Sequence, residues 1–383
     1  MTPHDIEHAA TDPAEAQKLS LVERYRLQTW FLGIIAFSMI LFLLVQARFI
    51  LISLVIAIIL FSLTADAITA FSRLRIGSWK ITNWLASMAA VTLIAVVLLT
   101  LSAIVISQVN TVVTTTLTYT DQAIAAIARV AALFSPEAEA TVETSIRSIQ
   151  VSSYITTAAG QAGNLLSATT LVILFVGFMF AERLWFNTKL ENLMHDKTQA
   201  HRIGRIIHSI VRRVNHYLLV KTGVSAATGA AVYVLMEAFG LEFAGPMAIL
   251  TFVLNYIPSV GSIIANILLG LVALVQVPEP ATALLIFVIG GMIQFMLGSV
   301  IDPMLMGRAL RVSSFGIIIS LAFWGAVWGI AGMFLAVPIM VAIMIVCSHI
   351  PSARPVAVLL SREGLPDFED EAEIEVGLRQ AAQ

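Results

Sequence analysis

Residues Ala244–Gln276, AGPMAILTFVLNYIPSVGSIIANILLGLVALVQ, decide the fold. These 33 residues contain no Lys, Arg, Asp or Glu, and as one straight helix they would be about 50 Å long. A single membrane span needs only about 20 apolar residues, because the hydrocarbon core is about 30 Å thick. Near the middle, Asn255–Gly261 contains Pro258, which removes a backbone donor and breaks a helix. The stretch is therefore predicted to be an interrupted membrane segment.

Residues Phe315–Cys347 have the same length and the same lack of charge. Three glycines interrupt this second stretch near its middle: Gly325, Gly329 and Gly332. Each long stretch follows a segment of ordinary span length, at 216–240 and 281–300. The C-terminal half is therefore predicted to hold two inverted repeats, each a span followed by a helical hairpin that enters and leaves the membrane on one side. The alternative is a pair of tilted, kinked spans.

The distribution of basic residues favours the hairpins. If each long segment crossed the membrane once, the loop of Arg308 and Arg311 would face outward, against the positive-inside rule. The loop at 73–80 and the segment at 183–221 are also basic and belong in the cytoplasm. Both chain termini are then expected in the cytoplasm.

Composition fixes the class of protein. Of the 383 residues, 58% are hydrophobic and 12% are charged, whereas a soluble protein has about 25% charged residues. A soluble enzyme is excluded, and the fold is predicted to be an all-α polytopic membrane protein with about eight membrane segments. The single cysteine excludes an internal disulfide and a cysteine-based metal site. No phosphate-binding loop or nucleophile motif is present, so enzyme activity, a metal, a cofactor and nucleic acid are not expected.

The chain is expected to lie in a bacterial inner membrane and to divide into seven parts. In order they are a cytoplasmic tail at 1–26, three membrane segments within 27–108, an extracytoplasmic helical insert at 109–162, a fourth span at 163–182, a basic amphipathic helix at 183–215, a transport core at 216–350 and an acidic cytoplasmic tail at 351–383.

Three motifs of the C-terminal half carry a resemblance: Ile257–Gly261, Val300–Pro303 followed by Gly307-Arg308, and Phe323–Pro338. They resemble the autoinducer-2 exporter family of bacterial permeases, and the order of apolar segments from about residue 27 to 350 agrees. Leu268 stands where that family often has a second proline. The resemblance implies a transporter; family members have been linked to export of autoinducer-2, and some to exchange of sodium or lithium against protons.

Candidate pathway residues fall into three groups. Asp302 lies at a span end, six residues before Arg308, and the two form either an intramembrane pair or a solvated one. Asn255, Asn266 and Gln294 are polar residues in apolar segments, suited to a hydroxylated solute, a dehydrated cation or interhelical hydrogen bonds. The third group shapes broken helices or permits close packing: Pro258, Gly261, Gly325, Gly329 and Gly332.

Together these features predict a gradient-driven permease that moves a small polar solute. The second hypothesis is a sodium (or lithium)/proton antiporter, which needs a carboxylate that titrates within the membrane, and Asp302 is the candidate. The third is a membrane scaffold that transports nothing. The expected partners are membrane lipid, a small polar solute or monovalent cation, and further copies of the chain in a homo-oligomer.

Overall fold

The computed structural model describes residues 13–72, 88–108, 151–194, 197–306, 312–362 and 364. These residues form helices joined by turns, with a single isolated bridge between Val312 and Ser361. The all-α prediction is confirmed for this part of the chain. The chain divides into two compact units, Met1–Leu51 and Ile52–Gln383.

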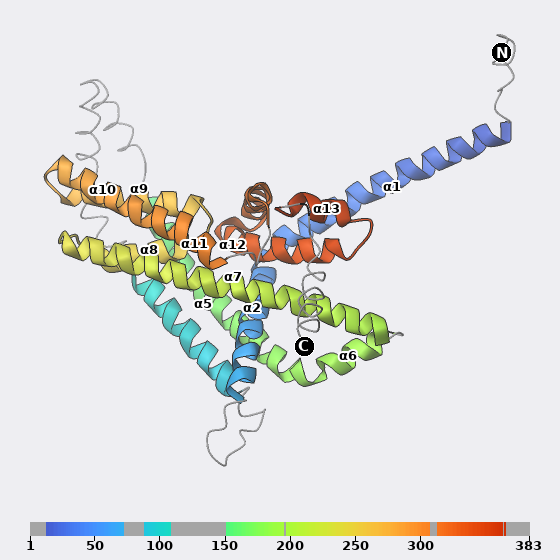
Figure 1. Cartoon of the computed structure of the whole chain (residues 1–383), viewed down its shortest axis with the longest axis horizontal. Coiled ribbons are helices and arrows are strands. Elements are labelled where there is room, and N and C mark those ends of the chain that lie inside the picture. Colours follow the sequence, from blue (N-terminus) through green and yellow to red (C-terminus); the bar gives the residue numbers. More distant parts are fainter. Residues whose placement is uncertain are drawn as a thin grey trace, which may run out of the picture. The chain divides into compact units, whose positions relative to one another are not determined.

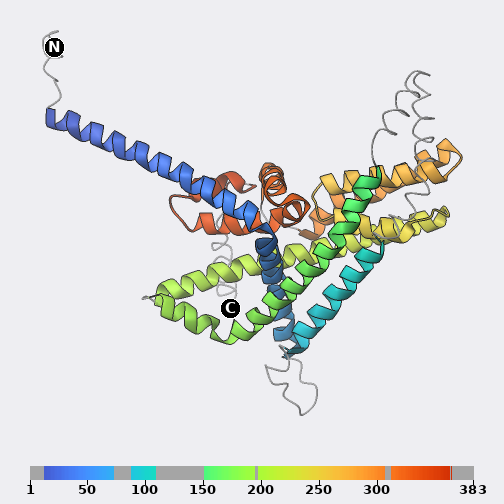
Figure 2. The same cartoon turned by 180° about the vertical axis from the view of Figure 1, so that it is seen from behind.

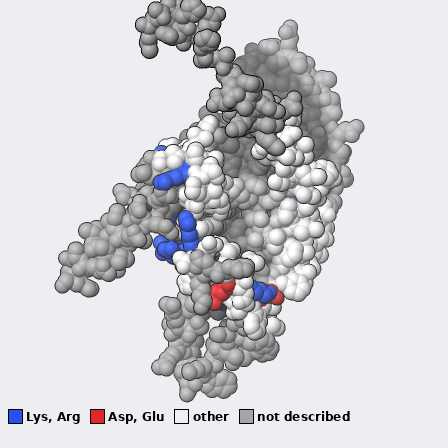
Figure 3. Space-filling model, turned by 90° about the vertical axis from the view of Figure 1, so that its right-hand side faces the viewer, with Lys and Arg blue, Asp and Glu red and all other residues white. Residues whose placement is uncertain are grey.

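Seven helices within the described ranges are long and apolar enough to cross a membrane. They are α1 (Pro13–Gln46), α2 (Arg48–Ser72), the helix Met88–Gln108, α5 (Val151–Glu182), α7 (Lys197–Ala238), the helix Pro280–Met306 and α12 (Ser314–Ser348). Two shorter apolar helices follow α7: α8 (Ala244–Leu254) and α9 (Val260–Gln276). A polytopic membrane protein is confirmed, and the prediction of about eight segments counted the α8–α9 pair as one. Figure 3 shows one face on which the described residues are mostly uncharged.

The first unit contains α1, whose apolar part is Gln28–Gln46. None of those residues is buried within the unit, and they include exposed side chains such as Trp30, Phe31 and Phe37. Ala47 alone separates α1 from α2. The apolar sequence from Gln28 to Ala65 is therefore divided at Ala47 into two candidate spans.

Three helices of the second unit share one core: α2, Met88–Gln108 and α5, coloured blue, cyan and green in Figure 2. Their contacts are apolar, with the rings of Phe61 and Phe180 edge to face at 4.9 Å. Polar atoms within this core pair with one another, as in the 2.8 Å hydrogen bond between the hydroxyls of Ser102 and Thr169. These helices therefore pack against each other with their buried hydroxyls satisfied.

Helix α7 is the longest element, with 42 residues and a length of about 63 Å. It runs without interruption past residue 215, where the predicted basic helix at 183–215 was expected to end. The short helices η2 (Arg183–Trp185) and α6 (Phe186–Leu193) precede it. In Figure 1 α8 lies alongside α7, and α7 also packs against α10, α11 and α12.

The first predicted interruption is confirmed. Helices α8 and α9 are joined by a turn at Asn255–Ser259 and pack against each other. In this turn Ser259 has φ 61° and ψ −47°, and the Val260 amide donates to the Pro258 carbonyl at 2.7 Å. This is the rare, strained form of the γ-turn. A Cβ atom on Gly261 would lie 1.7 Å from the Leu254 carbonyl oxygen, so only glycine lets the two arms approach this closely.

The second predicted interruption is also confirmed, at one of the three glycines. Gly329 has φ 64° and ψ −143°, a conformation open to glycine, and it divides α12 into two arms. The hydroxyl of Ser320 donates to the Ala336 carbonyl at 2.7 Å, although sixteen residues of straight helix would separate them by about 24 Å. Helix α12 is thus folded back on itself.

The two hairpins differ in turn conformation but share a close approach of their two arms at a glycine. A Cβ atom on Gly332 would lie 1.9 Å from the Trp324 carbonyl oxygen, as one on Gly261 would meet that of Leu254. Gly325, in contrast, lies inside a regular arm of α12 and faces the flexible side chain of Met333. After α12 the chain forms the short helix α13 (Arg354–Leu360), which packs against it.

Candidate functional site

A buried ion pair joins α7 to the helix Pro280–Met306. The ammonium of Lys221 donates to Oδ2 of Asp302 at 2.7 Å, and the two side chains are only 5% and 12% exposed. Charged side chains at membrane depth are costly and face the protein interior or a pathway. Asp302 is therefore buried rather than solvated, and its partner in the described part of the chain is Lys221. Arg308, the partner suggested by the sequence, lies outside the described residues.

A wide helical turn sets the direction of Asp302. The helix Pro280–Met306 consists of α10 (Pro280–Phe295), the π-helix η3 (Met296–Ile301) and α11 (Asp302–Met306). The Asp302 amide donates to the carbonyl of Leu297, five residues earlier, as in a π-helix. Pro303 follows at once and has no amide hydrogen to donate. Short π-helical segments within α-helices often mark functional sites.

The π-helix brings Gln294 and Asp302 onto one face. In a regular α-helix two residues eight positions apart are about 80° apart around the axis. One extra residue in the wide turn reduces this to about 20°. Both side chains are buried. Without η3, Asp302 would point away from the face that carries Gln294.

On α7, Tyr217, Lys221 and Ser225 follow one another at intervals of four residues and so lie on one face. All three are buried. The side-chain amide of Asn255 donates to the hydroxyl of Ser225 at 3.1 Å. Asn255 is the C-cap of α8, and its backbone amide donates to the carbonyl of Thr251 one turn earlier. The first hairpin thus begins its turn against the same face of α7 that carries Lys221.

Several buried polar atoms of α7, α8, α9 and the helix Pro280–Met306 have no hydrogen-bond partner among the described residues. They are Tyr217 Oη, Thr251 Oγ1, Asn266 Oδ1, Gln294 Nε2 and Oε1, and Asp302 Oδ1. We define the polar core as Tyr217, Lys221, Ser225, Thr251, Asn255, Gln294 and Asp302. A buried polar atom without a partner costs about 1–3 kcal/mol. The polar core therefore has donors and acceptors available for a polar ligand.

Asn266 lies at the neighbouring contact of α9 with α10. A Cβ atom on Gly290 would lie 2.8 Å from Asn266 Oδ1, and one on Gly291 would lie 3.3 Å from Nδ2. Gly290 is one turn before Gln294 on the buried face of α10. The polar groups of α9 and α10 thus lie next to each other along this face.

Tyr256, in the turn of the first hairpin, contacts the second hairpin. Its ring stacks on that of Phe334 with centroids 5.2 Å apart, and its hydroxyl bonds to that of Thr222 at 2.6 Å. Phe334 lies in the second arm of α12, and Thr222 is next to Lys221. One side chain therefore links both hairpins to the helix that carries the ion pair.

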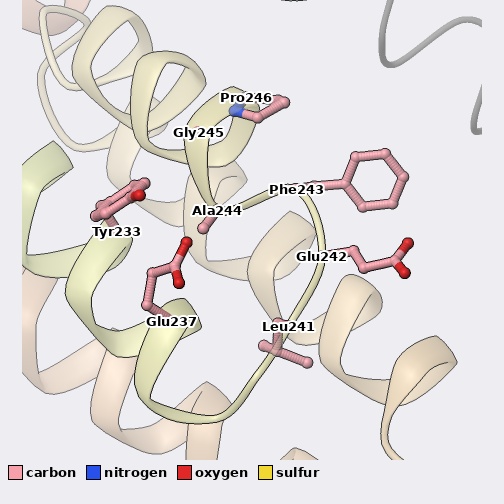
Figure 4. Close-up of a pocket in the computed structure, with 8 residues that line it drawn as sticks. All are labelled: Tyr233, Glu237, Leu241, Glu242, Phe243, Ala244, Gly245 and Pro246. Atoms are coloured by element: carbon pink, nitrogen blue, oxygen red, sulfur yellow. The ribbon is translucent and has the colours of Figure 1, made fainter.

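A separate pocket of about 440 Å³ lies where α7 gives way to α8. In Figure 4 the side chains of Tyr233 and Glu237 face each other, whereas Glu242 and Phe243 point away from them. The two glutamates do not converge on one point. The pocket therefore shows no shared carboxylate site.

Lys221 was not predicted as a site residue, because it ends the basic segment 183–221. Between Arg213 and Glu237 it is the one Lys, Arg, Asp or Glu in the sequence, so it falls within the predicted span at 216–240. It also lies on the buried face of α7 with Tyr217 and Ser225. An ionisable residue inside a span is a functional candidate by default, and that signal was available.

A known family matches most of this chain. The family described as AI-2E family transporter matches residues 32–352. The chain belongs to the AI-2E transporter family. The resemblance noted in the sequence is therefore confirmed. The chain is a multi-pass membrane protein of a bacterial family of transporters, which is not a family of enzymes.

Curated relatives match over part of their length. The AI-2 transport protein TqsA of Escherichia coli K12 is 31% identical over 52% of this chain and 57% of its own. A Haemophilus influenzae protein whose name proposes a transport function is 34% identical over 51% and 56%. A Borreliella burgdorferi protein named in the same way is 29% identical over 54% and 57%. This AI-2E chain thus spans little more than half the length of the curated relatives that it matches.

Proposed function

We propose that this AI-2E protein is a secondary transporter that moves a small, hydroxyl-bearing polar solute across the bacterial inner membrane, driven by a gradient rather than by ATP. The observation that carries the proposal is the ion pair of Lys221 and Asp302, which is buried but only partly satisfied. A buried pair is stable only when its remaining donors and acceptors find partners. Transport would supply these partners each time that the solute binds.

The pair favours a neutral hydroxyl over an ion. A bare cation at Oδ1 of Asp302 would lie near the Lys221 ammonium, and two like charges 4 Å apart repel by about 4 kcal/mol at an effective dielectric constant of 20. An anion at the ammonium would meet the carboxylate in the same way. A hydroxyl group can donate to Oδ1 and accept from the ammonium. The amide of Gln294 offers a further donor and acceptor on the same face.

Autoinducer-2 export is the first activity to test, because TqsA is named an AI-2 transport protein. Purified protein in proteoliposomes would be given labelled autoinducer-2 and labelled sodium side by side, under an imposed proton or sodium gradient. We expect gradient-dependent flux of the solute. The combined change Pro258→Ala and Gly329→Leu is expected to abolish it, because both hairpin turns would be altered. Solute flux that survives this change would contradict a pathway through the hairpins.

Alternating access is proposed to use α8–α9 and α12 as re-entrant hairpins of two inverted repeats. Support comes from the matching close approaches at Gly261 and Gly332 and from the positive-inside rule. Cysteines introduced one at a time near Arg311 would be labelled from either side of the membrane. Cytoplasmic labelling is expected, as it is at both termini, and external labelling would exclude the hairpins. The first four spans are proposed as a scaffold or as the interface of a homo-oligomer.

A sodium (or lithium)/proton antiporter is the second candidate, because Asp302 is a buried carboxylate whose Oδ1 has no hydrogen-bond partner among the described residues. In this case the proteoliposomes would exchange cation against proton without moving autoinducer-2. The change Asp302→Asn would then abolish the exchange. Full ion-coupled transport by that variant would exclude Asp302 as the coupling carboxylate. A scaffold without transport predicts no flux in either assay and no effect of the hairpin changes on its biological role.

A further inference from the structure

We infer that Lys221 is a tethered cation: its ammonium occupies the place on Asp302 that a coupling sodium, lithium or other monovalent cation would otherwise take. Solute transport by this chain would then need no cation bound at Asp302. The inference rests on the proposed function, because it concerns the same polar core. It goes further by assigning Lys221 as the residue that decides whether a cation takes part.

The geometry matches that role. The ammonium lies on α7 and the carboxylate on α11, so the contact of 2.7 Å bridges two elements, as a bound ion would. Both side chains are almost fully buried. A covalently attached ammonium keeps the carboxylate neutralised without an ion having to enter from either side. The pair as a whole carries no net charge.

Electrostatics explains why no second cation would bind. Asp302 is the one carboxylate in the polar core, and Lys221 already matches its charge. A second cation on the other carboxylate oxygen would give the buried site a net positive charge, which is unfavourable in a medium of low dielectric constant. The reverse also holds. Without Lys221 the carboxylate would be buried and unpaired, and a small cation would become the favourable partner.

Thermal unfolding of the purified full-length protein tests the inference without any solute. Wild type and Lys221→Ala would be compared in choline, sodium, lithium and propylammonium chlorides at equal ionic strength. The wild-type melting temperature is expected to be the same in all four. Lys221→Ala is expected to melt lower in choline, which has no N–H to donate, and to recover several degrees in sodium, lithium or propylammonium. The recovery should grow with cation concentration, because a ligand that binds only the folded state stabilises it by mass action.

Three variants separate a cation site from a general loss of stability. Lys221→Arg keeps the charge and should stay insensitive to the cation. The double change Lys221→Ala with Asp302→Asn removes both charges and should lose the cation response. Lys189→Ala is the matched control, since Lys189 pairs with Glu182 at an exposed site where water already solvates the carboxylate. It should melt like the wild type in every salt.

Two results would overturn the inference. One is a wild-type melting temperature that rises in sodium or lithium and loses this rise in Asp302→Asn. The other is a Lys221→Ala protein that melts equally in choline and in the small cations. If Lys221→Ala cannot be purified, Asp302→Asn gives the mirror experiment, because it leaves the ammonium unpaired. That variant should then be stabilised by chloride or bromide relative to gluconate, and the same melting temperature in all three anions would overturn the inference.

Discussion

At the scale of single residues, the polar core combines one buried ion pair with several buried polar atoms that have no hydrogen-bond partner among the described residues. Lys221 and Asp302 are 81 positions apart, so their pairing depends on how α7 packs against α11 and has no local sequence signal. Asp302 and Gln294 could be singled out from the sequence, because polar residues in apolar segments stand out one at a time, and the structure shows both of them buried. Whether they carry solute stays a prediction.

Gln294 is the residue whose change separates binding from stability. Gln294→Leu removes a buried amide with no partner among the described residues, so we expect the protein to gain up to about 1 kcal/mol of stability. Solute affinity should fall roughly tenfold, which corresponds to about 1.4 kcal/mol. Melting temperature and the KM for solute flux measure the two effects. A large loss of stability with an unchanged KM would assign Gln294 to the structure instead.

At the scale of elements, the interruptions were predictable and the π-helix was not. Proline and glycine act on the backbone at their own position, so Pro258 and the glycines of α12 marked the breaks from sequence alone. The sequence did not single out Gly329, because Gly325 and Gly332 have the same local propensity. The wide turn of η3 depends on the packing of α10 and α11 against α7, which no local pattern encodes.

The glycines of the two hairpins should differ in their tolerance of alanine. Gly261→Ala is expected to cost at least 3 kcal/mol, by rough comparison with other core overpacking, because its Cβ would meet a backbone carbonyl. Gly329→Ala should cost about 1–3 kcal/mol, because φ 64° with ψ −143° is a backbone conformation that residues other than glycine rarely adopt. Gly223→Ala is the control, since a Cβ on this helical glycine meets nothing within 4 Å. The melting temperature is expected to be lowest for Gly261→Ala, higher for Gly329→Ala and highest for Gly223→Ala. Equal losses of melting temperature for all three variants would contradict the hairpin geometry.

Deleting one residue of the π-helix should turn Asp302 away from Lys221. Removal of Gly298, whose Cβ position is open, would restore a regular helix and rotate the following residues by about 100°. The expected loss is about 3–5 kcal/mol, the cost of leaving one charge of a buried pair alone. Gly298→Ala keeps the residue count and serves as the control. A deletion variant as stable as that control would show that the wide turn does not position Asp302.

At the scale of the whole second unit, Tyr256 links parts that are distant in sequence. Its ring contacts the second hairpin and its hydroxyl contacts α7. Sequence alone predicted the two interrupted segments but not their contact, because an aromatic pair between segments has no spacing rule. The predicted division into seven parts stays a prediction, although α7 runs through one of its boundaries.

The coupling between the hairpins is measurable as a double-mutant cycle. Tyr256→Ala and Phe334→Ala, singly and together, should give an interaction free energy of about 0.5–1.5 kcal/mol. Tyr256→Phe keeps the stacked ring and loses only the hydroxyl bond to Thr222, so the same cycle started from it should give the same value. An interaction energy near zero would mean that the hairpins respond independently.

The distance of 81 residues between the two charges also has a consequence for biosynthesis. At a translation rate of about 5–20 residues per second, Lys221 leaves the ribosome roughly 4–16 s before Asp302 does. During this interval α7 must enter the bilayer with an unneutralised lysine, which costs about 2.5–3.5 kcal/mol at the centre of a span. The nascent helix is therefore expected to stay shallow, with the lysine reaching toward the headgroups, until the carboxylate arrives. Final insertion of α7 would thus wait for synthesis of a helix that follows it.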